Sequence, residues 1–399
     1  MAIQIEGTVS PWNRQGIEGS PAFSDPPKVA DCTLRDGEQQ AGLVFSKDDK
    51  IAIAKRLDSV GVHELEIGTP AVSAEDREAI EQIASLGLHA SLSALARARK
   101  DDIDLVARCG VQGVRISLPI GERQRRAKLD LGDEEYLRLA FDITAYAKSQ
   151  GLIVIFSPYD TTRAELGLLE RLLRMLSDSR QVDRVRLVDT AGAATPQSIA
   201  FLTQFMRETG NGLPIEVHCH NDLGLATSNT IAGALAGAAY LSVTVNGIGE
   251  RAGNAALEEV VVALKILYGI DLGIRTEELC SLSAEVVARS GVALQPHKAV
   301  VGRNAFAHET GMVVAGLSKD TYTAEPYAPE IVGQTRSILM GKKSGRASVE
   351  YKLRMLGIEA APDAIDLIVH QVKDAAISKR RALSDDEFVS VVKLVTTGS

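Results

Sequence analysis

The feature that most constrains the fold of this sequence is a pattern of helix, glycine and strand that repeats along the chain. Each unit holds apolar residues at helical spacing, then a glycine suited to ending a helix, then a short β-prone run. In the first complete unit, Ser46 and Asp49 have the spacing of a capping box, and Gly61 is predicted to be the C-cap before a strand at 63–67. The pattern therefore predicts alternating helices and strands.

Eight strands, each followed by a helix, are expected from this pattern. We predict strands at 29–33, 63–67, 88–93, 113–118, 152–157, 182–188, 214–220 and 240–246. We predict the helices at 46–60, 74–86, 101–109, 133–150, 162–178, 195–209, 223–236 and 254–268. Because the strands are too short and apolar to face water, we predict an α/β fold, a closed (β/α)8 TIM barrel rather than a doubly wound sheet. The first strand is not followed by GxGxxG, which argues against a dinucleotide fold.

The sequence divides into three predicted segments. Residues 1–27, rich in Gly, Pro and Ser, form an N-terminal lead-in, and residues 28–270 form the barrel. Residues 271–399 form a mainly helical C-terminal module without expected strands, in which 321–345 is expected to be linker and loop. Its expected helices lie at 277–290, 361–381 and 384–395.

Composition excludes several classes of function. The 399 residues carry a net charge of −8, which argues against binding to nucleic acid or an anionic membrane. There is no signal peptide pattern and no run of apolar residues long enough to span a bilayer. The four cysteines are far apart and form no CxxC pair, so we expect free thiols and a cytoplasmic location.

Two motifs at predicted strand ends indicate a metal site. Arg35 and Asp36 follow the first strand, and His218 and His220 lie two residues apart on the seventh, so both imidazoles point the same way. Two imidazoles and one carboxylate are an ordinary ligand set for a divalent cation that keeps open positions. Each motif alone is explained by a solvated turn or a polar strand end, but barrel enzymes collect catalytic groups at the carboxyl ends of their strands.

Longer motifs resemble the metal-dependent acyl-transfer and lyase superfamily that includes 2-isopropylmalate synthase, homocitrate synthase and hydroxymethylglutaryl-CoA lyase. The resemblance covers about residues 28–350, and ISLPIGERQRRAKL at 116–129 is most similar to the homocitrate-synthase-like branch. It rests on DCTLRDGEQ (31–39), LEIGTP (65–70), DTAG (189–192), EVHCHNDLGLA (216–226), NGIGERAGNA (246–255), FAHETG (306–311) and GKKSG (341–345).

The resemblance implies a reaction and a ligand set. The expected reaction condenses the acetyl group of acetyl-CoA with a small 2-oxo acid, releasing CoA and a 2-hydroxy dicarboxylic or tricarboxylic acid, as in homocitrate synthesis. Asp36, His218 and His220 would hold Mg, Mn, Zn or Co, with Asn254 nearby, and the ion would act as a Lewis acid on the oxo acid's carbonyl.

The resemblance also implies roles for residues around the metal. Arg35 would neutralise the developing oxyanion, and Glu66 corresponds to the family's acid on strand 2. Gln39, Arg163 and Thr190 would contact the substrate, together with Arg35. The alternative for Glu66, Arg163 and Thr190 is an interior network of salt bridges and hydrogen bonds.

The chain departs from the family pattern at positions that matter for catalysis. Val313 stands where the synthases carry a second histidine, so we expect His308 to be the base, or else merely to hydrogen-bond within the C-terminal module. Lys343 replaces a family histidine, and the strand-5 motif reads SPYDTTR. The glycine-rich loop lacks the cysteine of the lyases, which favours condensation over cleavage.

Two other functions and one assembly stay open at this point. A lyase or aldolase could cleave a 2-hydroxy acid on the same scaffold, and a regulator that binds metabolites without turnover is the alternative from a different class. By resemblance we expect a homodimer in which residues 306–316 close the partner's site.

Overall fold

The structure is a computed structural model, and it describes residues 8–13, 15 and 25–397. Most of the predicted lead-in at 1–27 lies outside these described residues. The chain forms two compact units. The first covers Trp12–Ala293, and the second covers Leu294–Ser399 with the described residues 8–11.

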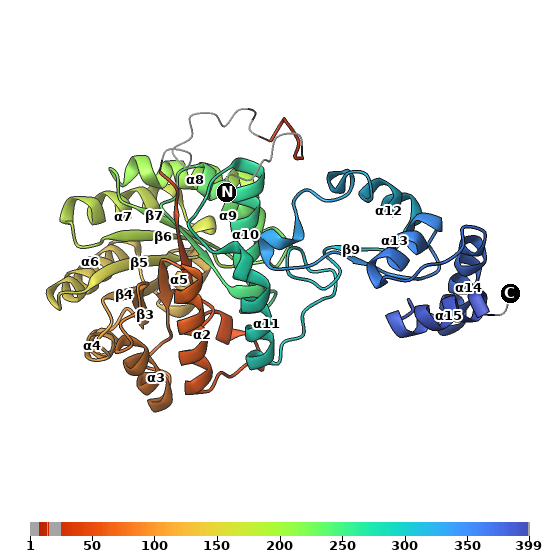
Figure 1. Cartoon of the computed structure of the whole chain (residues 1–399). Coiled ribbons are helices and arrows are strands. Elements are labelled where there is room, and N and C mark those ends of the chain that lie inside the picture. Colours follow the sequence, from red (N-terminus) through yellow and green to blue (C-terminus); the bar gives the residue numbers. More distant parts are fainter. Residues whose placement is uncertain (1–7, 14, 16–24, 398–399) are drawn as a thin grey trace. The chain divides into compact units, whose positions relative to one another are not determined.

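The first unit contains a closed barrel of eight parallel strands arranged in chain order (Figure 1). The predicted TIM barrel is confirmed. The strands are β1 (Lys28–Asp31), β2 (Glu64–Glu66), β3 (Ser91–Arg97), β4 (Gly113–Pro119), β5 (Ile153–Tyr159), β6 (Arg184–Asp189), β7 (Ile215–Cys219) and β8 (Tyr240–Val243). Because β8 pairs with both β7 and β1, the carboxyl ends of all eight strands meet at one mouth.

Helices follow every strand of the barrel, as the repeating pattern predicts. Ser46 and Asp49 do form a capping box at the start of α2, and Gly61 ends that helix with a φ of 97°. The helices are α2 (Lys47–Val60), α3 (Ala74–Ala84), α4 (Lys100–Arg108), α5 (Glu122–Lys128), α6 (Asp133–Ser149), α7 (Leu166–Ser179), α8 (Pro196–Thr209), α9 (Ala226–Leu235), α10 (Leu257–Ala263) and α11 (Leu279–Ser290). Helix α5, a second helix after β4, was not expected.

Charged side chains fill part of the barrel interior, although the strands were expected to be apolar. Arg184 and Arg186 of β6 form ion pairs with Glu64 and Glu66 of β2, at 2.6 and 2.8 Å. Strands β2 and β6 lie opposite each other in the ring, so these pairs cross the interior. The other members of this interior ion-pair network are Arg115 of β4 and Glu216 of β7.

The second unit is mainly helical, which confirms the prediction for the C-terminal region. The expectation that it lacks strands is wrong, because β9 (Ala307–His308) pairs in parallel with β10 (Ser337–Ile338). Its helices are α12 (Gly311–Leu317), α13 (Arg346–Leu356), α14 (Ala364–Lys379) and α15 (Asp385–Thr397). Phe388, Val372 and Ile368 are fully buried in its core. In the part of the chain that the structure describes, every helix is too short or too polar to cross a membrane.

Candidate metal centre

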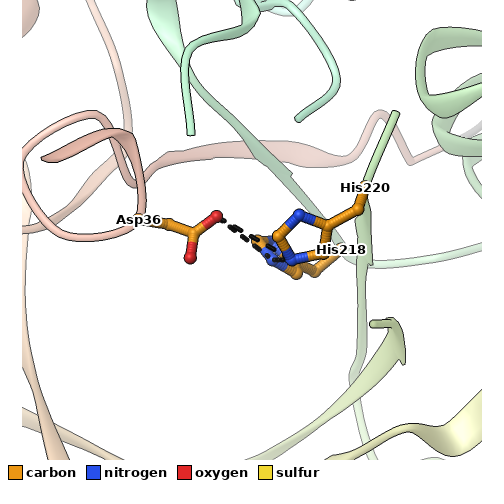
Figure 2. Close-up of side chains that lie close together, drawn as sticks. All are labelled: Asp36, His218 and His220. Carbon is orange, nitrogen blue, oxygen red and sulfur yellow. Dashed lines mark hydrogen bonds and ion pairs between the residues drawn. The ribbon is translucent and has the colours of Figure 1, made fainter. Parts of the chain in front are cut away.

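Asp36, His218 and His220 converge at the mouth of the barrel (Figure 2). Asp36 lies on the turn after β1, His218 is on β7, and His220 follows that strand directly. The two Nε2 atoms are 3.3 Å apart, and they lie 3.8 and 3.9 Å from Oδ2 of Asp36. All three side chains are buried, so three possible ligand atoms face one small space.

Neighbouring side chains fix the orientation of the cluster. Arg35 donates Nη1 to Oδ1 of Asp36 at 2.7 Å, and Asn254 donates Nδ2 to Oδ2 at 2.5 Å. Nδ1 of His218 lies 2.9 Å from the hydroxyl of Ser242. When Nδ1 donates its proton to this hydroxyl, Nε2 of His218 carries the lone pair and faces the other ligand atoms.

Protonation states favour cation binding at this centre. Burial lowers the pKa of both imidazoles, and Arg186 helps to hold that of His218 well below its usual range. Burial alone would raise the pKa of Asp36, but the Arg35 guanidinium first, then the two histidines and the hydrogen bond from Asn254, outweigh this effect and lower the pKa to about 2. Two neutral imidazoles and one carboxylate are therefore available near neutral pH.

The donor set fits a divalent cation. Two neutral imidazoles and a carboxylate suit several such ions and leave coordination positions open. Nδ1 of His220 and Oδ1 of Asn254 are buried and have no hydrogen-bond partner among the described residues. Such polar atoms are costly to bury unsatisfied. This Oδ1 belongs to the amide that donates to Asp36, so it is consistent with a centre built for a further group, whereas Nδ1 of His220 is on the side of the ring away from Nε2.

Arg35 is held rigidly beside the cluster by Glu66. Its Nε donates to Oε1 of Glu66 at 2.6 Å, and its Nη2 donates to Oε2 at 3.2 Å. Burial opposes ionisation of Glu66, but Arg186, Arg35 and Arg115 outweigh it and hold the pKa of the carboxyl well below its usual range. Glu66 thus belongs to the interior ion-pair network, the alternative raised from the sequence, and also orients the Arg35 guanidinium.

A cavity of about 360 Å³ opens beside the cluster, and we call it the site cavity. Of the predicted substrate residues, Arg35, Gln39 and Thr190 line it, whereas Arg163 does not. The Nε of Arg163 instead donates to Oδ1 of Asp160 at 2.7 Å. The contact of Arg163 with a substrate therefore stays a prediction.

His308, the predicted base, belongs to the second unit. Its Nε2 lies 2.9 Å from Oε1 of Glu325, which also accepts a hydrogen bond from Arg336. His308 thus makes the kind of internal contact that the sequence left open as its alternative. Its catalytic role stays a prediction.

Sequence reasoning missed four cations that line the site cavity: Arg97, Arg186 and Arg251 of the strands and loops, and Lys128. Arg186 could have been noticed, because arginines alternate with apolar residues in a strand that the barrel encloses on both faces. Lys128 carries no such signal, since it lies on the unpredicted helix α5.

Two family models match this chain. Residues 26–286 match the family described as HMGL-like. The chain belongs to the HMGL-like family. Residues 300–380 match the model described as homocitrate synthase post-HMGL domain-like, so the C-terminal region extends the HMGL-like domain as it does in homocitrate synthases.

Curated relatives span nearly the whole chain. The homocitrate synthase AksA of Methanothermobacter thermautotrophicus is 40% identical, over 97% of this chain and 97% of its own. The AksA of Methanopyrus kandleri is 42% identical, over 97% and 96%. The (R)-citramalate synthase CimA of Methanocaldococcus jannaschii is 43% identical, over 92% of this chain and 74% of its own.

A solved structure of the HMGL-like fold covers the barrel. The hydroxymethylglutaryl-CoA lyase of Pseudomonas aeruginosa matches with a TM-score of 0.60 and 20% identity, over 69% of this chain and 96% of its own. At this identity the likeness supports the fold alone.

Proposed function

We propose that this protein condenses the acetyl group of acetyl-CoA with a 2-oxo acid, releasing CoA and a 2-hydroxy acid. The proposal rests mainly on one observation: the buried side chains of Asp36, His218 and His220 lie close together at the mouth of the barrel, and Arg35 contacts Asp36 beside them. Relatives that match across the length of the chain are named as homocitrate, citramalate and isopropylmalate synthases, which supports the same class of reaction.

The residues around the cluster have complementary roles in this proposal. Asp36, His218 and His220 hold a divalent cation, with Asn254 beside it, and a bound cation polarises the carbonyl of the oxo acid. Arg35 neutralises the negative charge that develops on the carbonyl oxygen as the carbon–carbon bond forms. Because Glu66 already fixes the guanidinium, little reorganisation is needed when that charge appears.

A second cavity suits the acyl-CoA. It measures about 390 Å³ and shares Arg35 and Gln39 with the site cavity. Its wall includes the apolar residues Leu34, Leu43 and Phe45. The wall also carries charged side chains, among them Lys47 and Lys50. A pocket of mixed apolar and charged lining that adjoins Arg35 suits the arm that delivers a thioester to the reacting carbonyl.

Condensation is favoured over the two alternatives. The lyase structure covers only 69% of this chain, whereas the model of the homocitrate synthase domain matches residues 300–380 beyond the barrel. A regulator without turnover would have no need for the oriented pair of Arg35 and Glu66 beside the metal ligands.

The experiment that tests the proposed function mixes the protein with acetyl-CoA and a panel of 2-oxo acids and follows thiol release with a thiol-reactive dye. We expect release with at least one oxo acid in the presence of a divalent metal, and none after the metal is removed with a chelator. The absence of release with every oxo acid and metal would contradict condensation.

We also propose a homodimer in which residues 306–316 of one subunit close the site of the other. Co-expression of His218→Ala and His308→Ala chains tests this, since each variant alone lacks an essential group. If sites are shared, mixed dimers hold one intact site and recover part of the activity. No recovery in purified mixed dimers would contradict the shared site.

We place the protein in the cytoplasm, because none of its four cysteines, all of them described, forms a disulfide.

A further inference from the structure

The site cavity has two walls that face each other across the barrel mouth. One wall carries the metal ligands, which come from β7 and from the turn after β1. These two strands are the neighbours of β8, and β4 lies opposite β8 in the closed barrel. On the opposite wall, Arg97 of β3, Ser117 of β4 and Ser157 of β5 are direct register partners, and all three line the cavity. For a small oxo acid bound at the cluster, β3, β4 and β5 would form the far side of the cavity.

One cation of the site cavity differs from the others. Each of the four arginines that line the cavity forms an ion pair with a carboxylate: Arg35, Arg97, Arg186 and Arg251. Lys128 also lines the cavity, yet no carboxylate lies within 4.0 Å of its ammonium among the residues that the structure describes. Its contacts are with Tyr159, whose hydroxyl lies 3.3 Å and whose ring centroid lies 5.0 Å from Nζ.

Helix α5 holds Lys128 in place. Gln124 and Lys128 are four residues apart, so they share one face of the helix, and both line the site cavity. The buried Arg125 anchors the helix through an ion pair with Asp133 at 2.7 Å. At the start of the helix, a Cβ at Gly121 would collide with the carboxylate of Asp160, so only glycine lets the helix lie this close to the loop after β5.

We propose that Lys128, together with Tyr159 and Gln124, binds a carboxylate at the far end of the oxo acid. The preferred substrate is then a 2-oxo dicarboxylic acid, and not pyruvate or a branched 2-oxo monocarboxylic acid. The inference rests on the proposed function and names the substrate class for it. Lys128 is exposed where it borders the cavity, so its ammonium is free to form a charge-assisted hydrogen bond with an anionic tail, whereas an aliphatic tail offers it no such partner.

Two hydroxyls that line the site cavity support this assignment, one on β5 and one directly after β6. Ser157 and Thr190 line the cavity and offer donors to a carboxylate, although Thr190 already accepts a hydrogen bond from the backbone N–H of Asp160 at 2.7 Å. Apolar side chains at this end are few, with Leu95 and Val188 in the lining. The wall is therefore suited to a charged tail.

The test compares 2-oxoglutarate with pyruvate as acceptors of the acetyl group, using thiol release and the selectivity, defined as the ratio of the two kcat/KM values. We expect the wild type to favour 2-oxoglutarate. In Lys128→Met the selectivity falls about 10- to 100-fold, the scale of losing one hydrogen bond to a charged group, and Lys128→Arg restores much of it. Arg126→Met is the matched control, because Arg126 is an exposed cation of the same helix that pairs with Glu122. An unchanged selectivity in Lys128→Met, or a wild type that favours pyruvate, would overturn the inference.

A binding experiment separates this inference from the proposed function. Calorimetry with the metal-loaded protein measures the affinity for 2-oxoglutarate and for 2-oxobutyrate, which lacks the second carboxylate, without any need for turnover. Tighter binding of 2-oxoglutarate that disappears in Lys128→Met supports the carboxylate site even if no thiol is ever released. Equal affinities for the two acids in the wild type reject the carboxylate site, whether or not condensation occurs.

Discussion

The Nε atom of Arg35 lies 2.6 Å from Oε1 of Glu66, and this contact joins the metal centre to the barrel interior. Glu66 accepts from Arg186 as well, at 2.8 Å, so the same carboxylate holds a guanidinium of the site and a guanidinium of the interior ion-pair network. The position of Arg35 is therefore set by the packing of the barrel and does not depend on a flexible loop.

Arg35→Lys tests the role of this geometry. The variant keeps the positive charge but loses the planar fork of donors, so we expect kcat to fall by about 100-fold or more, the scale of losing one oxyanion donor. Metal content is expected to change little. Arg99→Lys is the control, because Arg99 is an exposed residue on the same end of the barrel that does not line the site cavity. Near-normal turnover in Arg35→Lys would show that Arg35 does not act on the reaction.

Replacing His218 or His220 by Ala is expected to abolish both bound metal and turnover while the fold persists. The ligands lie at the barrel mouth, so their loss does not remove an apolar layer of the core. Elemental analysis of the purified variants measures metal content, and circular dichroism checks the fold. His89→Ala serves as the control, since that side chain is 98% exposed. Unchanged metal content in both variants would refute the ligand assignment.

The base is tested by exchange of the acetyl-CoA methyl protons with heavy water, followed by NMR with and without an oxo acid. If His308 removes the proton, His308→Ala loses this exchange while oxo acid binding survives. His370→Ala, an exposed histidine of α14, is the control. Equal exchange in wild type and His308→Ala rejects His308 as the base, and no exchange in either points to a substrate other than acetyl-CoA.

Asp31 gives the stability of the protein a predicted pH dependence. Burial raises the pKa of this carboxyl to about 7, even though Thr33 donates two hydrogen bonds to it. Between its ordinary value near 4 and about 7, the folded state binds more protons at Asp31 than the unfolded state does. The free energy of unfolding therefore falls as the pH rises through this range, by at most about 1.4 kcal/mol per pH unit, and the loss is complete above it.

Asp31→Asn removes the titrating group and isolates this contribution. We expect the wild type to lose stability relative to the variant as the pH rises from about 4 to about 7, with no further relative change at higher pH. Urea unfolding at several pH values, with and without the substitution, measures the difference. Parallel pH profiles of the two proteins would contradict the raised pKa.

The sequence predicted the barrel because its helices carry apolar faces and explicit ends, such as the Ser46 capping box and the Gly61 C-cap. Helix α5 was missed because ERQRRAK has almost no apolar residue from which a helical period could be read. The pairing of β9 with β10 was missed because each strand has two residues, and their contact joins segments far apart in the sequence.

The candidate metal ligands were predictable because each motif stands at the end of a predicted strand, and barrel topology brings such ends together. The substrate wall was not predictable in the same way. Whether the exposed Lys128 also borders the site cavity depends on how α5 lies on the loop after β5, and that depends on the close approach of Gly121 to Asp160.

The charged interior of the barrel restricts how this protein can change over evolutionary time. Each of its carboxylates contacts at least two guanidinium groups, so a single neutral replacement leaves the buried charges of the network unbalanced. Conversion to an apolar interior requires several coordinated substitutions, with unstable intermediates between them. We therefore expect descendants of this chain to retain Glu64, Glu66, Glu216, Arg115, Arg184 and Arg186 as one inherited set or to replace them jointly.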